Sequence, residues 1–363
     1  MSASRPPRPK AAQAWAGPLQ LLLRLLVMGI GLGVITGTAL KLLAPRLSQG
    51  QAAAPRALQA PLPSLQPLQR GLELGRFEPR TELTALSQTW AKLAAQQKDL
   101  QVSGFLLVLD DGRYAQLQPD QPLPAASSIK TPVLLAALEE LDAGRLKWND
   151  PLLLTKEVVG GGAGWMASRP LGTRFPFWEA ATEMIRVSDN TATNLLIKRL
   201  GGKSRLNTRF QAMGLSATVI RNWLPDLEGT NTTSAHDLAR TIALVDTGEK
   251  LSPRARDLFR EVMGKSRTNT LLPLGLLMGL GGDSADPDSE LLARGVTVLN
   301  KTGDIGIAYA DGGLIELPNG QRAVAAFMVK GPFNDPRSTD LIRAMAAEIS
   351  HTLIQGGARP TGR

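Results

Sequence analysis

The chain has 363 residues, 43% of them hydrophobic, which is enough to bury one large core or two modest ones. It contains no cysteine, which excludes disulfides, thiolate metal sites and cysteine nucleophiles. Its two histidines, His236 and His351, do not stand in a metal-ligand spacing, so we expect neither a metal nor another cofactor. We expect His236 at a capped helix start and His351 in a C-terminal helix, not in a catalytic triad.

The formal net charge of +9 is concentrated near the N-terminus. The first 80 residues hold ten Lys or Arg and two acidic residues, whereas the rest of the chain carries 31 basic and 30 acidic residues. The body of the protein is therefore close to neutral and shows no basic patch. We expect no nucleic-acid partner.

The N-terminal part predicts an attachment to a membrane. A basic, Pro-rich tail (1–16) precedes an apolar segment (17–42), in which 22 residues from Leu19 to Leu40 are interrupted by a single arginine. Such a run is long enough to cross a bilayer, and the basic flank favours a cytoplasmic N-terminus. We expect a single-pass inner-membrane protein with its body in the periplasm. The alternative is a cleaved signal peptide that releases the protein to the periplasm.

A Pro-, Ala- and Gln-rich linker (43–80) leads to one folded body (81–357), and a short tail (358–363) follows it. The body begins with a predicted helix and a hairpin turned by Asp111-Gly112, and it ends with three strands and a helix. The middle, about 128–262, is mostly helical by pattern. The sequence thus predicts an α/β (α+β) fold, in which an αβα layer domain carries an inserted helical domain. The predicted helices are 81–99 and 337–355, and the predicted strands are 102–109, 113–117, 296–300, 306–317 and 322–329.

The motif Ser127-Ser-Ile-Lys130 is the single S-x-x-K of the chain and stands just before an apolar run. On a helix, residues three apart lie on one face, so Lys130 can act as the base for Ser127 once burial lowers the pKa of its ammonium. Read alone, the motif also fits a serine helix cap followed by an exposed lysine.

Two further motifs follow in order. Ser188-Asp-Asn190 stands at a junction between two predicted helices, and Lys301-Thr-Gly303 closes the predicted strand 296–300. The three together are the set found in class A β-lactamases and penicillin-binding proteins.

From about residue 90 to 355 the chain resembles class A β-lactamases, most closely the β-lactamase-like family often met in cyanobacteria. Gly161-Gly-Ala-Gly-Trp-Met166, Gly229-Thr-Asn-Thr-Thr-Ser234 and Lys301-Thr-Gly-Asp-Ile-Gly306 carry the closer match. The resemblance implies an αβα sandwich with an antiparallel sheet and an all-helical lobe, which agrees with the layers predicted above.

The resemblance also implies a role for each matching residue. Ser127 would attack the amide carbonyl while Lys130 takes its proton, and Ser188 would pass a proton to the leaving nitrogen. Asn190 would hold the substrate amide and Lys130. Lys301 and Thr302 would bind the substrate carboxylate, with Lys301 also holding Ser188. The N–H groups of Ser127 and Asp304 would bind the oxyanion.

The chain departs from the family in the loop that frees the acyl-serine. Class A enzymes carry a water-activating glutamate within Arg-Trp-Glu-Pro-Glu-Leu-Asn, which corresponds here to Arg221-Asn-Trp-Leu-Pro-Asp-Leu-Glu228. Alignment on the shared Trp, Pro and Leu places Leu224 at the glutamate and Glu228 at the asparagine. A leucine cannot activate water. Glu228 either takes over that role or is a solvated loop acid.

Two other departures concern the substrate side. No arginine follows Lys301-Thr-Gly303 on the next strand, where class A enzymes usually place one near the substrate carboxylate. The segment from Gly275 to Gly295 has the character of an insertion.

We therefore expect a monomeric serine hydrolase that is acylated at Ser127 and cleaves β-lactams or a related peptidoglycan-derived amide. Such an activity implies β-lactam breakdown and antibiotic resistance. Two alternatives stay open: a penicillin-binding DD-peptidase with slow deacylation, and a non-catalytic periplasmic binding module.

Overall fold

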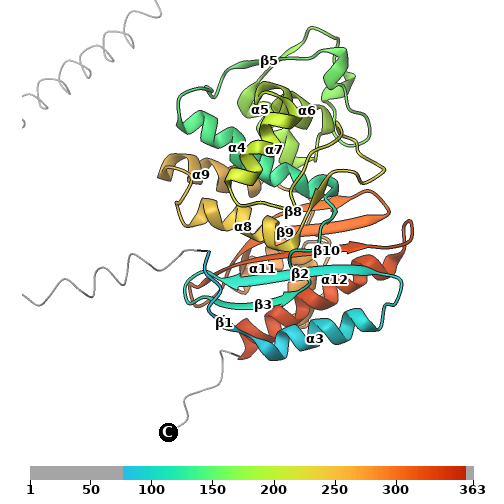
Figure 1. Ribbon diagram of the computed structural model, residues 1–363. Helices are drawn as coiled ribbons and strands as arrows, with labels where there is room; N and C mark the ends of the chain where they lie inside the picture. Colours follow the sequence, from blue (N-terminus) through green and yellow to red (C-terminus); the bar gives the residue numbers. More distant parts are fainter. Residues whose placement is uncertain (1–76, 357–363) are drawn as a thin grey trace, which may run out of the picture. The chain divides into compact units, whose positions relative to one another are not determined.

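The computed structural model describes residues 77–356, which belong to one compact unit. Its centre is a six-stranded sheet with the strand order β1-β3-β2-β10-β9-β8 (Figure 1). The two-residue β1 is parallel to β3, and every other pair is antiparallel. The predicted antiparallel sheet is thus confirmed, with β1 as the exception. The strands are β1 (Thr81–Glu82), β2 (Gln101–Val108), β3 (Arg113–Leu117), β8 (Thr297–Asp304), β9 (Ala308–Glu316) and β10 (Arg322–Lys330).

One face of the sheet is covered by four helices: α3 (Thr84–Ala95), α10 (Leu272–Gly279), α11 (Pro287–Ala293) and α12 (Pro336–Ile349). Trp90 is fully buried there, and its indole N–H donates to the carbonyl of Met345 at 2.9 Å. The predicted insertion forms most of α10 and all of α11. Gly279 lets α10 approach α12 closely, because a Cβ at this position would lie 2.3 Å from the carbonyl oxygen of Ala347. The insertion is therefore part of the outer helical layer.

The other face carries α8 (Ala235–Asp246) and, beyond it, the helical lobe (Figure 1). Helix α8 begins as predicted, because the Ser234 hydroxyl caps it by accepting a hydrogen bond from the Asp237 amide at 3.1 Å. The lobe has its own apolar core, which α4 crosses. Its helices are α4 (Lys130–Asp142), α5 (Phe177–Arg186), α6 (Asn190–Arg199), α7 (Gly202–Ala212) and α9 (Pro253–Met263). Two short pairs of strands complete it: β4 (Leu123–Pro124) with β7 (Thr232–Thr233), and β5 (Pro151–Leu153) with β6 (Arg174–Pro176).

One strand differs from its prediction in a way that matters for the site. We expected the strand to end at Asn300, with Lys301-Thr-Gly303 just beyond it. In the structure β8 continues to Asp304, because its pairing with β9 runs on to Asp304 opposite Tyr309. The motif therefore lies within the sheet, where ladder hydrogen bonds fix its backbone.

The predicted membrane segment lies outside the described residues, as do the basic tail, most of the linker and the C-terminal tail. These boundaries stay predictions. From residue 77 to residue 356, none of the helices has both the length and the apolar character needed to span a bilayer.

Candidate active site

Ser127 lies where the sheet meets the helical lobe. It belongs to a single 3₁₀ turn, Ala126–Ile129, that leads directly into α4. Ser127 is half-buried, whereas its neighbour Ser128 is buried and donates its hydroxyl proton to the carbonyl of Ala125 at 2.6 Å. The two adjacent serines thus have different roles, and only Ser127 opens on the cavity described below.

Lys130 is the centre of the site. Its side chain is fully buried, and Nζ lies 2.9 Å from Ser127 Oγ, 2.9 Å from Ser188 Oγ, 2.9 Å from Asn190 Oδ1 and 2.6 Å from the Ser188 carbonyl oxygen. The alternative in which Lys130 is an exposed residue behind an ordinary helix cap is therefore excluded, and the predicted burial of Lys130 is confirmed. Burial and the nearby charge of Lys301 hold the pKa of Lys130 well below its usual range, against the opposing charge of Asp189. A neutral amine at this place can accept the Ser127 proton.

Ser188 and Asn190 reach Lys130 from the junction between α5 and α6. Ser188 has a left-handed backbone conformation with φ 59°, a strained geometry for a serine. Asp189 stabilises the junction: its carboxylate caps α6 at the Ala192 amide and also accepts from the Trp165 and Met166 amides. The middle residue of the motif, Asp189, thus fixes the junction, while Ser188 and Asn190 on either side of it face Lys130.

The glycine-rich stretch 161–166 supports the same junction. The side-chain Nδ2 of Asn190 donates to the Gly161 carbonyl at 2.8 Å. Gly164 has φ 94°, and a Cβ there would lie 2.1 Å from the Asp189 carboxylate. A residue with a side chain at Gly164 would therefore displace the loop that orients Ser188 and Asn190.

Strand β8 forms the opposite wall. Lys301 is buried, and its Nζ donates to the Thr302 carbonyl at 2.6 Å. We expected Lys301 to hold Ser188 as well. Within residues 77–356 no hydrogen bond joins the two, and Lys130 holds Ser188. Burial lowers the pKa of Lys301 to about 8, although the charge of Asp311 opposes the shift.

Gly303 sets the distance between β8 and the nucleophile turn. A Cβ on Gly303 would lie 2.9 Å from the Ser127 amide nitrogen and 2.8 Å from that of Ser128, so only glycine lets the strand lie so close to the nucleophile turn. Asp304 follows as an exposed residue whose carboxylate accepts from the Gly306 amide at 2.8 Å.

A cavity of about 210 Å³ opens beside Ser127. Asp304 and Asn190 also line it, so the cavity brings together three predicted site residues. The predicted site residue Thr302 does not line it, because its Oγ1 turns toward Asp311 and the Thr268 carbonyl. The full lining is Ala126, Ser127, Gly162, Ala163, Asn190, Leu224, Pro225, Asp226, Leu227, Asp304 and Ile305.

The loop from 221 to 228 closes one side of this cavity. Leu224 is buried and lines it, as the alignment on this loop predicts. Glu228 is exposed and is not among the lining residues, so its role as the water-activating base stays a prediction. Asp226, which the sequence analysis passed over, is buried and lines the cavity; its carboxylate accepts from Thr230 Oγ1 and from the Asn231 amide.

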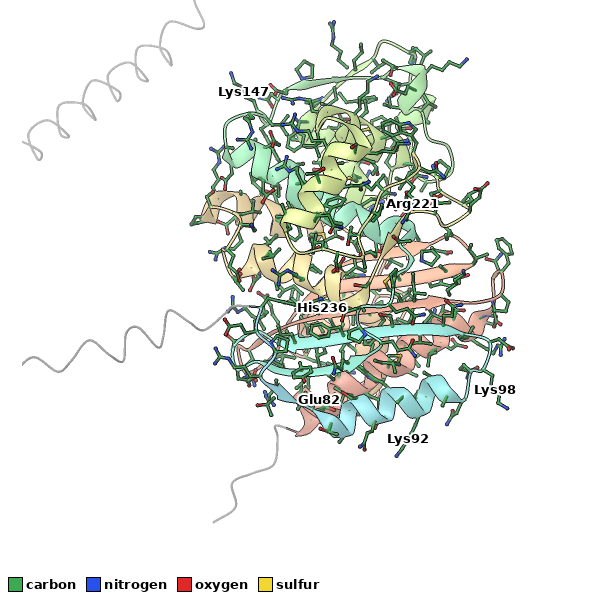
Figure 2. The ribbon with its side chains drawn as sticks, in the orientation of Figure 1. Glu82, Lys92, Lys98, Lys147, Arg221 and His236 are labelled. Carbon is green, nitrogen blue, oxygen red and sulfur yellow. The ribbon has the colours of Figure 1, made fainter. Side chains whose placement is uncertain are left out.

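The two histidines take no part in this site. His236 lies beside the sheet (Figure 2), between the rings of Phe77 and Phe105 and 3.4 Å from an Asp120 carboxylate oxygen. His351 is exposed in the π-helical turn Ser350–Gln355 that continues α12. In the described part of the chain, no three His, Cys, Asp or Glu side chains gather as metal ligands.

The fold and the cluster around Lys130 define a serine hydrolase of the β-lactamase type. The family model described as "Beta-lactamase enzyme family" matches residues 85–353, and the chain belongs to this family. The resemblance seen in the motifs is thereby confirmed.

Individual relatives agree with the family model. A β-lactamase of Rhodobacter capsulatus is 30% identical over 189 residues, which cover 50% of this chain and 64% of the relative. A β-lactamase of Streptomyces albus G is 29% identical over 41% of this chain and 51% of the relative. The chain thus spans about half to two thirds of these curated relatives.

Solved structures match over more of the body. The structure of PBP-A is 41% identical with a TM-score of 0.70 and covers 76% of this chain and 98% of PBP-A. A second PBP-A structure with the same scores is a leucine-to-glutamate mutant, described as an acyl-enzyme complex with penicillin-G. An ancestral class A β-lactamase is 22% identical with a TM-score of 0.63, over 74% of this chain and 99% of that one, and shows the shared fold.

Proposed function

We propose that this protein is a serine hydrolase that forms an acyl-enzyme at Ser127 with β-lactams or a related cell-wall amide. The observation that carries the proposal is the buried Lys130, whose Nζ lies 2.9 Å from both Ser127 Oγ and Ser188 Oγ. One amine thus connects the hydroxyl that would attack the carbonyl with the hydroxyl that would protonate the leaving nitrogen.

The proposed acylation starts when Ser127 Oγ attacks the amide carbonyl and gives its proton to Lys130 Nζ. The new oxyanion accepts hydrogen bonds from the backbone N–H groups of Ser127 and Asp304, which line one cavity. Collapse of this intermediate breaks the C–N bond. The proton then passes from Lys130 through Ser188 to the leaving nitrogen, and Lys130 becomes neutral again. Lys301 is the proposed holder of the substrate carboxylate. Thr302 could join it only if its hydroxyl turned away from Asp311 and the Thr268 carbonyl, which it contacts in the structure.

Release of the acyl group needs a base for the attacking water, and Leu224 cannot supply one. Two acids of the loop are candidates: Glu228, which is exposed, and Asp226, which lines the cavity. If Glu228 is the base, Glu228→Gln should slow release about 10²- to 10⁴-fold while acylation stays nearly intact. Asp226→Asn is the matched comparison: slow release in that variant alone would assign the role to Asp226.

A second candidate function, a penicillin-binding DD-peptidase that deacylates slowly, is favoured by Leu224 on the cavity wall. The acyl-enzyme of the PBP-A mutant with penicillin-G supports the first chemical step in both candidates. Leu224→Glu would place a carboxylate beside the acyl group. We expect it to raise turnover if wild-type release is slow.

Burst kinetics with a chromogenic cephalosporin separate the candidates. A burst equal to the enzyme concentration without turnover indicates the peptidase-like protein, and steady hydrolysis indicates a β-lactamase. No reaction at all would refute acylation and leave a binding module.

We further propose that the catalytic body lies in the periplasm, attached by the apolar segment 17–42. The support is the length of that segment and its basic flank.

A further inference from the structure

Asp311 is a buried acid that the proposed mechanism does not use. It lies on β9 directly opposite Thr302 of β8, and its side chain is fully buried. Its carboxylate accepts hydrogen bonds from Asn300 Nδ2 at 2.9 Å, from the Leu272 amide at 3.0 Å and from Thr302 Oγ1 at 3.2 Å. A buried carboxylate is costly, so three donors that converge on it from β8 and the start of α10 need an explanation.

The position of Asp311 relative to Lys301 explains why these three donors bind it. Side chains alternate along a strand, so Asn300 and Thr302 lie with Asp311 on the face toward α10, and Lys301 lies on the face toward the nucleophile. The residue opposite Lys301 is Gly312. Asp311 therefore holds the residues on both sides of Lys301 from the back of the sheet.

Charge connects the same residues. Asp311 raises the pKa of Lys301 against the effect of burial, and the charge of Lys301 lowers the pKa of Lys130. Burial raises the pKa of Asp311 itself to about 6, and its hydrogen bonds and Lys301 oppose this shift. Three titratable groups on β9, β8 and α4 thus form one electrostatic path from the back of the sheet to the nucleophile.

Other charged groups around this path are few. Helix α10 carries no titratable side chain, and Asp189, at the start of α6, faces Lys130. On α8, which packs on the other face of β9, Asp237 is bound to Ala217 and Thr218, and Arg240 donates to the Met213 carbonyl. The remaining charged or titratable residues of α8 and β9 bind elsewhere: His236 with Asp120, Asp246 with Arg260 and Arg322, Glu316 with Arg260, and Tyr309, whose hydroxyl donates to Asn334 Oδ1 at 3.4 Å.

We propose that Asp311 is a positioning residue of the acylation site, which fixes Asn300 and Thr302 from the back of the sheet and keeps Lys301 charged. The charge of Lys301 in turn lowers the pKa of Lys130 and so favours the neutral amine that can accept the Ser127 proton. The inference rests on the proposed acylation of Ser127.

The test is the rate of Ser127 labelling by a fluorescent penicillin between pH 5 and pH 9.5. In the wild type the rate should fall as the pH rises through about 8, where Lys301 loses its proton. In Asp311→Asn this fall should move to lower pH. A displacement of about one pH unit would lower the rate at pH 8 about fivefold. Asp237→Asn, which removes another buried carboxylate, should leave the midpoint unchanged.

A folded Asp311→Asn variant with the wild-type midpoint would overturn the inference. Should Asp311→Asn not fold, Asp311→Ser keeps an acceptor for the Leu272 amide and should show the same displacement. If neither variant folds, Asp311 serves the fold alone, and the inference is again overturned. A wild-type chain that penicillin does not label and that does not hydrolyse penicillin would instead refute the proposed function.

Discussion

Asn194 fixes the loop that carries Leu224, and its removal gives a sharp test of that link. From α6, Asn194 Nδ2 donates to the Leu224 carbonyl at 2.7 Å and Oδ1 accepts from the Leu224 amide at 2.9 Å. Both residues are buried, so Asn194→Ala leaves the two backbone groups of Leu224 without these partners in a place that water reaches poorly, and the Val158 carbonyl loses a longer hydrogen bond of 3.3 Å. An unsatisfied buried polar group costs about 1–3 kcal/mol, so we expect a loss of about 2–5 kcal/mol in the free energy of unfolding.

The chain offers a matched control. Asn207, on α7, binds the backbone of Ile220 in the same way. Its Nδ2 donates to the Ile220 carbonyl at 2.9 Å, and its Oδ1 accepts from the Ile220 amide at 2.8 Å, but its side chain is only partly buried. We expect Asn207→Ala to lose about 1 kcal/mol, because water can replace the lost bonds. Urea unfolding measures both losses. A fluorescent penicillin should show altered acylation or release in Asn194→Ala alone. Equal losses in both variants, or unaltered kinetics in Asn194→Ala, would refute the reasoning.

Three further predictions follow from the packing, the charges and the N-terminal sequence. Gly303→Ala should slow acylation about 100-fold, because its Cβ would push β8 away from the Ser127 turn, whereas Gly161→Ala, which opens into free space, should label normally. Arg145 and Arg209 hold the pKa of the Glu140 carboxyl at about 2, so the ion pairs of Glu140 stabilise the fold fully above about pH 4.5 and progressively less as the pH falls toward 2. In urea unfolding, Glu140→Gln should lower the free energy of unfolding by about 1–3 kcal/mol at pH 7 and by little at pH 2. In cell fractionation the full chain should stay with the membrane and a chain starting near residue 80 should be soluble and folded, whereas a mature N-terminus at Leu40 would establish a cleaved signal peptide.

The sequence predicted those parts of the site in which short-range order determines the geometry. Ser127 and Lys130 are three residues apart on one turn, and the stretch from Ser188 to Asn190 is a single helix junction, so their motifs already contain the arrangement. The layered fold was predictable for a similar reason, because its strands and helices have distinct hydrophobic periods.

Residues that act across the fold left no such pattern. Asp311 meets Leu272 and Asn300 over sequence separations of 39 and 11 residues, and Asn194 meets Leu224 over 30. Nothing local distinguishes these residues from ordinary polar positions. The extension of β8 through Lys301 to Asp304 was missed because a strand boundary depends on its partner strand, here β9.

The most direct test of the account is mass spectrometry of the protein after incubation with penicillin G, followed by peptide mapping. The account predicts one penicilloyl adduct per chain, on the peptide that contains Ser127. It predicts the adduct in Ser128→Ala as well, and none in Ser127→Ala. An adduct that persists in Ser127→Ala, or a wild-type chain that neither gains an adduct nor hydrolyses penicillin G, would contradict the assignment of Ser127 as the nucleophile.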